Sequence, residues 1–462
     1  MDTGNSTTSC VAFKPLGTWE KLSFGLSSFS TNLIINSIIL FLLFYYTDVF
    51  GISAGTAGII FLTGRIFDAV NDPLIGYFVD NTNTRWGKLR PYLLFGPIPL
   101  AVFFVLCFTG PDFSDTGKVI YAFIIFTVLM TLFGVVNIPN TAMAAVMTQD
   151  PHERSSLSAM SMIFVSLGAF FVSAFTQPII SQFSSQKQGF QAVSIIFAVI
   201  AVLLYWNCFL FVKERVHVAD KGNKTTLRIA LKSIYKNPPL MILCASFFFF
   251  MLMLNLRLGA VMYYFKYNVG QEQLAVFYLV MMSITNIVFS LLYLPIMKKI
   301  GKRSTFIIGA VVACLANLGV VIAPYSSIIL IFIFSFFATA AAASMPLCAY
   351  SMLPDTVEYA EWKLGVRNEG FIFSAISFIN KIAMALAGAI SGFILSGTGY
   401  VANKTQETAT LNGILGMMAV IPAVACAIAC ILIYFYKLDA FQFNKIVCEI
   451  AKRKSEEGSI HV

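Results

Sequence analysis

Twelve apolar stretches, each long enough to cross a lipid bilayer as a helix, constrain this chain more than any other feature. A spanning helix needs about 20 consecutive, mostly apolar residues. Six such stretches lie on each side of a polar, basic segment, at approximately 22–47, 53–79, 91–110, 119–146, 157–180, 190–212, 240–265, 272–297, 304–323, 327–352, 369–396 and 411–437. The pattern predicts an all-α integral membrane protein with twelve transmembrane helices in two six-helix halves.

Composition argues against a set of soluble domains. Hydrophobic residues make up 58% of the 462-residue chain and charged residues 11%, whereas soluble domains are about half apolar and about a quarter charged. No polar domain interrupts the apolar stretches. We therefore expect a tail at 1–21, a first half at 22–212, a central loop at 213–239, a second half at 240–437 and a tail at 438–462.

The formal net charge of +9 indicates orientation in a membrane rather than nucleic acid binding, because the basic residues are concentrated in alternate loops. Lys and Arg residues next to membrane spans stay on the cytoplasmic side. Most of the 31 basic residues lie in the two tails and in every second loop, and the other loops hold only Lys118, Lys187, Lys266 and Lys404. Both termini and the central loop are therefore predicted to be cytoplasmic.

A short internal repeat supports the division into halves. The loop after the second span contains Arg85-Trp-Gly-Lys-Leu-Arg90, and the equivalent loop of the second half contains Lys299-Ile-Gly-Lys-Arg303. Two parallel six-helix halves joined by a cytoplasmic loop describe the major facilitator architecture. In that architecture the substrate site lies between the halves near the middle of the membrane.

Ionisable residues inside predicted spans are the first site candidates, because such groups are costly in a membrane unless they are paired or hydrated. Asp68 and Asp72 lie four residues apart and share one helix face with Arg65 one turn away. Two carboxylates on one face repel each other unless a cation or proton joins them, so the pair is a candidate coupling site with Lys381 as counter-charge from the other half. The alternative is that these charges only pin helices together. Arg257, in the seventh span, either serves the site or snorkels toward the outer surface.

Charged residues on the predicted cytoplasmic side form a candidate gate. A short helix in the loop before the eleventh span is expected to carry acids on one side, and basic residues stand across the cytoplasmic face. The candidate gate residues are Asp355, Glu358, Glu361 and Arg367, together with Arg85, Lys88 and Arg90. Ion pairs between these groups would close the inner side when the cavity opens outward. The alternative is a solvated charged loop.

Nearly the whole chain resembles the glycoside–pentoside–hexuronide cation symporter family, which includes the melibiose and glucuronide carriers. The motifs that carry the resemblance are Tyr45-Tyr-Thr-Asp-Val49, Asp68-Ala-Val-Asn-Asp-Pro73, Arg85-Trp-Gly-Lys-Leu-Arg-Pro91, Asn137-Ile-Pro139, Asp355-Thr-Val-Glu-Tyr359, Gly365-Val-Arg367 and Lys381. The resemblance implies symport of a small sugar with Na⁺ or H⁺, without a further cofactor, by a monomer in a bacterial inner membrane.

The resemblance also implies roles for single residues. The implied cation ligands are Asp68, Asn71 and Asp72, and the implied substrate residues are Asn32, Asn137, Lys381 and Arg65. Lys381 would link cation binding to sugar binding. The melibiose carrier has aspartates where Asn32 and Asn137 stand, which makes galactoside transport doubtful. The loss of two negative charges removes repulsion toward an anionic uronide.

Two departures from the family pattern leave the coupling ion and the substrate open. Gly134 stands where the melibiose carrier has a hydroxyl that helps to hold sodium, and Met162 stands where it has a sugar-binding arginine. The ion is therefore either a proton or a sodium ion in a site of different composition. The alternative function is cation-coupled transport, by the same fold, of a non-sugar solute such as an amphiphile or a small organic acid.

The sequence lacks the residue patterns that catalysis or passive ion conduction would need. His152, His217 and His461 lie in loops or a tail, and no nucleophile–base pair accompanies them. The nine cysteines form no CxxC motif or Cys/His cluster, so no metal site is expected. No selectivity-filter repeat is present in the sequence. We therefore expect a transporter and not an enzyme.

Overall fold

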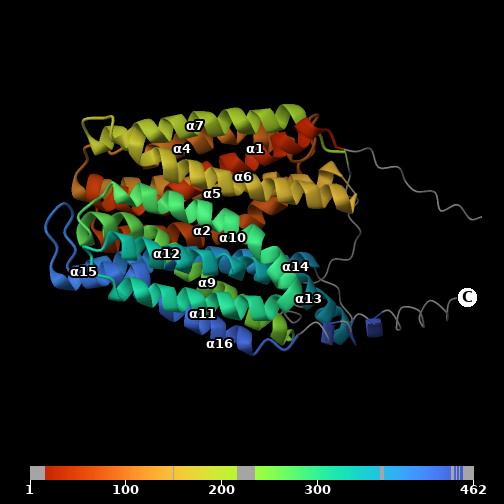
Figure 1. The fold of residues 1–462 in the computed structure, drawn as a ribbon. Coiled ribbons are helices and arrows are strands. Elements are labelled where there is room, and N and C mark those ends of the chain that lie inside the picture. Colours follow the sequence, from red (N-terminus) through yellow and green to blue (C-terminus); the bar gives the residue numbers. More distant parts are fainter. Residues whose placement is uncertain are drawn as a thin grey trace, which may run out of the picture.

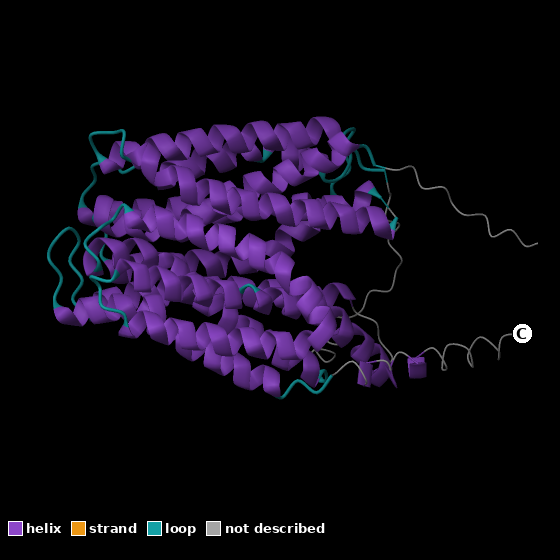
Figure 2. Cartoon of the chain, in the orientation of Figure 1, coloured by secondary structure: helices purple, strands orange, loops and turns teal. Residues whose placement is uncertain are grey.

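The computed structural model describes residues 16–148, 150–215, 235–364, 369–438, 442–443, 445–446 and 448–450. Within these residues the secondary structure is helical, apart from one isolated β-bridge between Thr84 and Gly87. The helices run along a common direction (Figure 2). In Figure 1 most first-half helices, red to yellow, lie on one side of the bundle, and most second-half helices, green to blue, lie on the other. The expected all-α class is confirmed.

The helices follow the predicted spans in order. Those of the first half are α1 (Thr18–Ser37), α2 (Ala54–Asn81), α3 (Arg90–Phe95), α4 (Pro97–Cys107), α5 (Asp115–Met147), α6 (Pro151–Ile180) and α7 (Gln186–Phe211). Those of the second half are α9 (Pro238–Tyr263), α10 (Leu274–Ile300), α11 (Lys302–Ile322), α12 (Ile328–Ala342), α13 (Ser344–Leu364), α14 (Glu369–Gly397), α15 (Thr408–Leu415) and α16 (Ile421–Tyr434). Short π-helical turns adjoin some of them, namely η1 (Ile38–Leu42), η2 (Tyr45–Val49), η3 (Tyr264–Asn268) and η4 (Gly416–Val420).

Length and hydropathy identify a multi-pass membrane protein. In the described part of the chain, ten helical stretches are long and apolar enough to cross a membrane. The second and third expected spans do not meet those criteria, and each has a physical reason. α2 carries three charged residues in its middle, Arg65, Asp68 and Asp72, and the third span is divided at Gly96 into the short helices α3 and α4.

The region before α14 differs from the prediction. The sequence predicts one span at 327–352 and then a separate short helix in a loop. Instead, α12 ends at Ala342, and α13 begins at Ser344 and runs without a break to Leu364. Polar side chains mark the end of a buried stretch but not the end of a helix, because backbone hydrogen bonds do not depend on side-chain polarity.

The first helix of each half ends in the same way. The helical stretches that begin with α1 and α9 both end in a π-helical turn, η2 and η3, and a glycine follows with positive φ, Gly51 at 82° and Gly270 at 77°. Glycine adopts this backbone conformation without the steric cost of a Cβ. The N–H of Phe50 donates to the Tyr45 carbonyl, and the N–H of Val269 donates to the Tyr264 carbonyl. These turns form a second internal repeat, longer than the one seen in the basic loops.

The two halves share a buried core at one end of the bundle. We call the end at which α3 and α11 begin the basic end, because Arg90 and Lys302 start these helices, and we call the other end the opposite end. Near the opposite end α2 and α14 cross with their backbones in contact, and a Cβ on Gly392 would lie 2.5 Å from the Ala54 carbonyl oxygen. One buried apolar cluster contains residues of both halves, whereas a second cluster consists of residues of the second half and of the tail that follows it.

Candidate functional site

Lys381 joins the two acidic residues of α2 from across the interface between the halves. Its Nζ lies 3.1 Å from Oδ2 of Asp68 and also pairs with Oδ2 of Asp72. The Asp68 side chain is only 2% exposed, while those of Lys381 and Asp72 are 22% and 26% exposed. The spacing of four residues places both carboxylates on one face of α2, as the sequence predicts. One ammonium group therefore bridges two carboxylates.

The other oxygen of each carboxylate has no partner among the described residues. Oδ1 of Asp68 and Oδ1 of Asp72 are buried and accept no hydrogen bond. Both oxygens face Gly134 on α5, where an added Cβ would lie 3.2 Å from Oδ1 of Asp72 and 3.7 Å from Oδ1 of Asp68. A buried anionic oxygen without a partner is costly. These two oxygens are therefore candidate ligands for a cation, a proton or a water molecule.

Asn71 lies beside the acidic pair but points its amide group to another helix. Its Nδ2 donates to Oγ1 of Thr131 on α5 at 3.0 Å, and Thr131 donates in turn to the Thr127 carbonyl. This arrangement orients the Asn71 amide and leaves its carbonyl oxygen as a potential cation ligand. Thr131 was not predicted from the sequence, since a threonine four residues from another one in an apolar helix carries no distinctive pattern.

Arg65 lies in a small cavity between the halves. Its side chain is largely buried, with 6% of the residue exposed. The cavity has a volume of about 40 Å³, and Asn255, Gly388 and Ser391 of the second half also line it. Among the described residues the guanidinium has no hydrogen-bond or ion-pair partner. A space of this size holds about three water molecules and no sugar.

The two asparagines expected to bind substrate differ in their surroundings. The Asn32 amide is engaged within α1, because Nδ2 donates to the Ser28 carbonyl and Oδ1 accepts from Asn36. Asn137 on α5 is half-buried, and its side chain has no hydrogen bond within the described part of the chain. Met162, on α6, is 63% exposed. Asn137 is therefore the more available of the two asparagines.

Three of the candidate gate residues make contacts within their own halves. Asp355 pairs with Lys302 at 2.7 Å, and Arg90 donates to the Phe209 carbonyl at 2.6 Å. The Arg85 guanidinium lies over the Trp86 ring. Lys88, Glu358 and Glu361 lie at the same basic end, while Arg367 falls outside the described residues. A gate of ion pairs between the halves stays a prediction.

A polar cluster at the opposite end does join the halves, and the sequence did not reveal it. We define the opposite-end cluster as Asp48, Lys266, Tyr267, Tyr400 and Asn403. The Asp48 carboxylate accepts from Lys266 at 2.8 Å and from the hydroxyls of Tyr267 and Tyr400. Asn403 donates to the Asp48 carbonyl at 2.8 Å and accepts from Lys266 at 2.7 Å.

Burial and the nearby Tyr263 and Asp48 raise the pKa of Tyr400 well above its usual value. The phenol therefore remains protonated and donates a hydrogen bond to Asp48. Asp48 lies in η2 and Lys266 lies in η3, so equivalent parts of the two halves meet here. The repeated Tyr-Tyr pairs at 45–46 and 263–264 were the available sequence signal. Further cross-half hydrogen bonds, such as Gln177 to Glu272 at 3.0 Å, join α6 to the start of α10.

Arg257 does not snorkel toward the outer surface. It is 2% exposed, and its guanidinium donates to the Tyr278 hydroxyl at 2.8 Å and to the Ser335 carbonyl at 3.3 Å. These partners lie on α10 and α12 of the same half. Arg257 therefore holds three second-half helices together and is not brought to the acidic pair.

Comparisons with known proteins identify the family and the fold of this chain. The profile of a family described as MFS/sugar transport protein matches residues 23–440. The isoprimeverose transporter of Lactiplantibacillus pentosus is 35% identical over 97% of this chain and 95% of its own length. The glucuronide carrier protein homolog of Escherichia coli (strain K12) is 32% identical over 96% of this chain and 97% of its own length. A solved bacterial homolog of the human lysosomal transporter Spinster, in an inward-facing and unoccupied conformation, shares the fold with a TM-score of 0.66 at 13% identity, covering 93% of this chain and 98% of that chain.

Proposed function

This chain belongs to the MFS/sugar transport protein family, and we propose that it is a symporter that couples sugar movement to Na⁺ or H⁺ by alternating access. It is a membrane transporter and not an enzyme. Relatives that share about a third of its sequence over nearly its full length are named for the transport of isoprimeverose or glucuronide. We accordingly propose a glycoside, a pentoside or a hexuronide as its substrate.

The observation that carries this proposal is the bridge from Lys381 to Asp68 and Asp72. The two carboxylates need a positive partner at this depth, and Lys381 supplies one from the other half. A coupling cation or proton that takes over the carboxylates sets the ammonium free. Lys381 is then available to a sugar hydroxyl or carboxylate in the cavity, so that ion and sugar bind together.

The cation itself would occupy the space beside Gly134. The unpartnered Oδ1 atoms of Asp68 and Asp72 face this space, and the carbonyl oxygen of Asn71 lies on the same helix. A proton needs only one of the carboxylate oxygens. A sodium ion needs several oxygen ligands, and because Gly134 offers no hydroxyl, a water molecule would supply the missing one.

We infer the state of the transport cycle from the end of the bundle at which the two halves are in contact. The opposite-end cluster and the α2–α14 crossing hold the halves together at one end. With the predicted orientation, in which the basic end is cytoplasmic, this is an inward-facing state. Outward opening requires that Asp48 separate from its second-half partners, and that the candidate gate at the basic end forms.

Substrate recognition is assigned to residues that line the interface between the halves. Arg65 and Lys381 carry positive charge there, and Asn137 offers an amide that has no partner among the described residues. Asn32 contributes only if its bond to Asn36 breaks. We also propose a monomer in a bacterial inner membrane with both termini in the cytoplasm.

Uptake into right-side-out vesicles tests the proposal. A panel of radiolabelled glycosides, pentosides and uronides is offered with Na⁺ and H⁺ gradients imposed separately. One sugar should accumulate under one gradient, and Asp68→Asn should abolish the accumulation. Asp112→Asn makes the same chemical change at a carboxylate whose side chain is 98% exposed and outside the site, so it should transport normally. If the inserted native protein accumulates no sugar under either gradient, the sugar assignment is wrong.

A further inference from the structure

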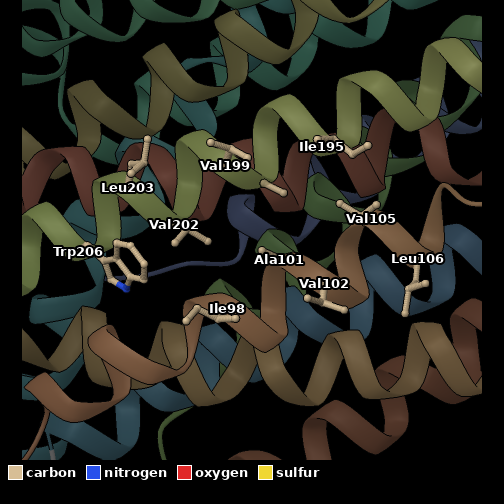
Figure 3. A pocket seen from close by; sticks show the side chains of 11 residues that line it. Ile98, Ala101, Val102, Val105, Leu106, Ile195, Val199, Val202, Leu203 and Trp206 are labelled. Carbon is tan, nitrogen blue, oxygen red and sulfur yellow. The ribbon is translucent and has the colours of Figure 1, made fainter.

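A groove on the outside of the first half has no role in the proposed transport cycle. It runs between α4 and α7 and has a volume of about 500 Å³. Figure 3 shows its lining, in which aliphatic side chains of α4 face those of α7. The lining residues are Ile98, Ala101, Val102, Val105, Leu106, Ile195, Ala198, Val199, Val202, Leu203 and Trp206. Apart from the Trp206 indole, every one of these side chains is aliphatic.

The length of the groove matches one leaflet of a bilayer. From Ile195 to Trp206 there are eleven residue steps on α7, which correspond to about 16 Å at the rise of an α-helix. The hydrocarbon core of a membrane is about 30 Å thick, so one leaflet supplies about 15 Å. Ala101 and Ala198, both buried, lie in the groove where larger side chains would fill it. A single acyl chain fits these dimensions.

The basic end of the groove is built around a fixed loop. The Trp206 indole donates to the Leu94 carbonyl at 2.9 Å. Just beyond the end of α7, the Glu214 carboxylate accepts from the backbone N–H groups of Lys88, Leu89 and Arg90. These contacts hold residues 88–94 against the end of α7. They also supply the Glu214 carboxylate with three backbone hydrogen-bond donors.

Two cations remain exposed beside that loop. Lys213 is adjacent to Glu214, is exposed, and has no hydrogen-bond or ion-pair partner in the described part of the chain. Arg85 is also exposed, and its one described contact is the Trp86 ring, 4.2 Å from its guanidinium carbon. A Cβ added at Gly87, two residues from Arg85, would lie 2.6 Å from the Glu214 carboxylate. The two cations therefore flank the same contact at the basic end, and Lys213 follows Trp206, the last groove residue on α7, by seven residues.

We infer that this groove binds an anionic phospholipid, with one acyl chain between α4 and α7 and the phosphate beside Arg85 and Lys213. Charge complementarity selects the headgroup, because both cations are exposed and the nearby Glu214 is already bonded. Anionic headgroups attract basic residues at a membrane surface. The groove selects a lipid rather than free phosphate, because the acyl chain covers apolar surface that phosphate leaves exposed.

Native mass spectrometry of the full-length protein in detergent tests the inference with palmitoyl-oleoyl phosphatidylglycerol and palmitoyl-oleoyl phosphatidylcholine as probes. The first phosphatidylglycerol should bind more tightly than phosphatidylcholine, by about fivefold for each of the two basic residues. Arg85→Gln with Lys213→Gln should remove this preference. Lys298→Gln with Lys299→Gln removes two exposed charges from the basic end of the second half and should leave the preference intact.

A second variant tests the groove independently of the charges. Val102→Trp with Val199→Trp adds bulk at two exposed lining positions and should weaken the first binding of both lipids. Two results would overturn the inference: equal binding of both lipids to the native protein, which indicates ordinary annular lipid, or a preference that the double Gln variant keeps. A dimeric species that disappears only in the Val102→Trp, Val199→Trp variant would instead show that a second copy of the chain covers the groove, and would also overturn it.

Discussion

The ammonium nitrogen of Lys381 lies 3.1 Å from a carboxylate oxygen of Asp68, and the two residues belong to different halves of the molecule. The contact connects the candidate cation site to the interface between the two halves, which move relative to each other during transport. Asp68 is almost fully buried, so it needs a positive partner in every state of the cycle. Sharing that partner between Lys381 and a coupling ion links ion binding to the movement of the halves.

Removal of Lys381 should destabilise the unloaded protein. Lys381→Gln leaves Asp68 and Asp72 facing each other without the ammonium, and we expect a loss of about 2 kcal/mol or more in unfolding free energy. The double variant Lys381→Gln, Asp68→Asn should recover part of that loss because the buried charge is gone. Thermal unfolding in detergent measures both.

Lys187→Gln is the matched control for that prediction. Lys187 pairs with Asp112, and both side chains are exposed, so this variant should lose about 1 kcal/mol or less. Equal losses of unfolding free energy in Lys187→Gln and Lys381→Gln would show that the pairing of Lys381 stabilises the fold no more than an exposed ion pair does.

The sequence predicted the acidic pair and its counter-charge because both depend on short-range or compositional signals. Asp68 and Asp72 are one helical turn apart, and Lys381 is conspicuous in an apolar span. Asp48 and Lys266 were missed because each lies at the end of a span, where a charge is ordinary. Their pairing depends on how the two halves pack across 218 residues of sequence. Arg257 was left open for the same reason, since its partners Tyr278 and Ser335 come from other helices.

If the vesicle panel shows that sodium drives uptake, replacement of Gly134 should change the response to sodium. In Gly134→Ser the new hydroxyl lies next to the unpartnered oxygens of Asp68 and Asp72, since the Cβ would be 3.2 Å and 3.7 Å from them. We expect the Na⁺ concentration that gives half-maximal stimulation of uptake to fall by about tenfold. The reason is that the hydroxyl adds one charge–dipole contact with the strength of a good hydrogen bond. Uptake measured across a sodium titration provides the value.

Gly76→Ser adds the same hydroxyl on α2, at a position with no atom within 4 Å of the new Cβ. It should leave the sodium response as in the native protein. A Gly134→Ser protein that folds and transports with an unchanged sodium response would place the cation elsewhere.

Loss of the Asp48 carboxylate should open the opposite end. Asp48→Asn removes the charge that Lys266 neutralises and weakens the bonds from Tyr267 and Tyr400. Ser391 lines the cavity between the halves that also holds Arg65, so a Ser391→Cys probe should react faster with an impermeant maleimide added from outside. We expect an increase of about tenfold, since hydrogen bonds to charged groups contribute about 1.5 to 3 kcal/mol.

Asp112→Asn, in the same Ser391→Cys background, controls for a change of surface charge on the same side and should leave the labelling rate unchanged. Labelling that is equally fast with and without Asp48 would mean that the cluster does not hold that end closed.

A side chain at the α2–α14 crossing should prevent close approach of the halves. A Cβ in Gly392→Ala would lie 2.5 Å from the Ala54 carbonyl oxygen and 2.7 Å from the Gly58 Cα, which is overpacking that costs about 1 to 3 kcal/mol. Hydrogen–deuterium exchange at the start of α2 should therefore be faster. Gly397→Ala, in the same helix and with nothing within 4 Å of its Cβ, should exchange as the native protein does. Slow exchange in both variants would contradict the assignment of the crossing as a closure contact.

Cation movement driven by a sugar gradient tests the central claim most directly. Proteoliposomes that contain the native protein receive an inward gradient of the sugar identified in the vesicle panel, with equal Na⁺ and H⁺ on both sides. Internal Na⁺ and pH are then followed together. We predict that the sugar gradient drives one of these ions inward in the native protein and in Asp112→Asn, but not in Asp68→Asn. If the sugar equilibrates in the native protein while neither ion moves, the protein is a passive sugar carrier and Asp68 and Asp72 are not a coupling site.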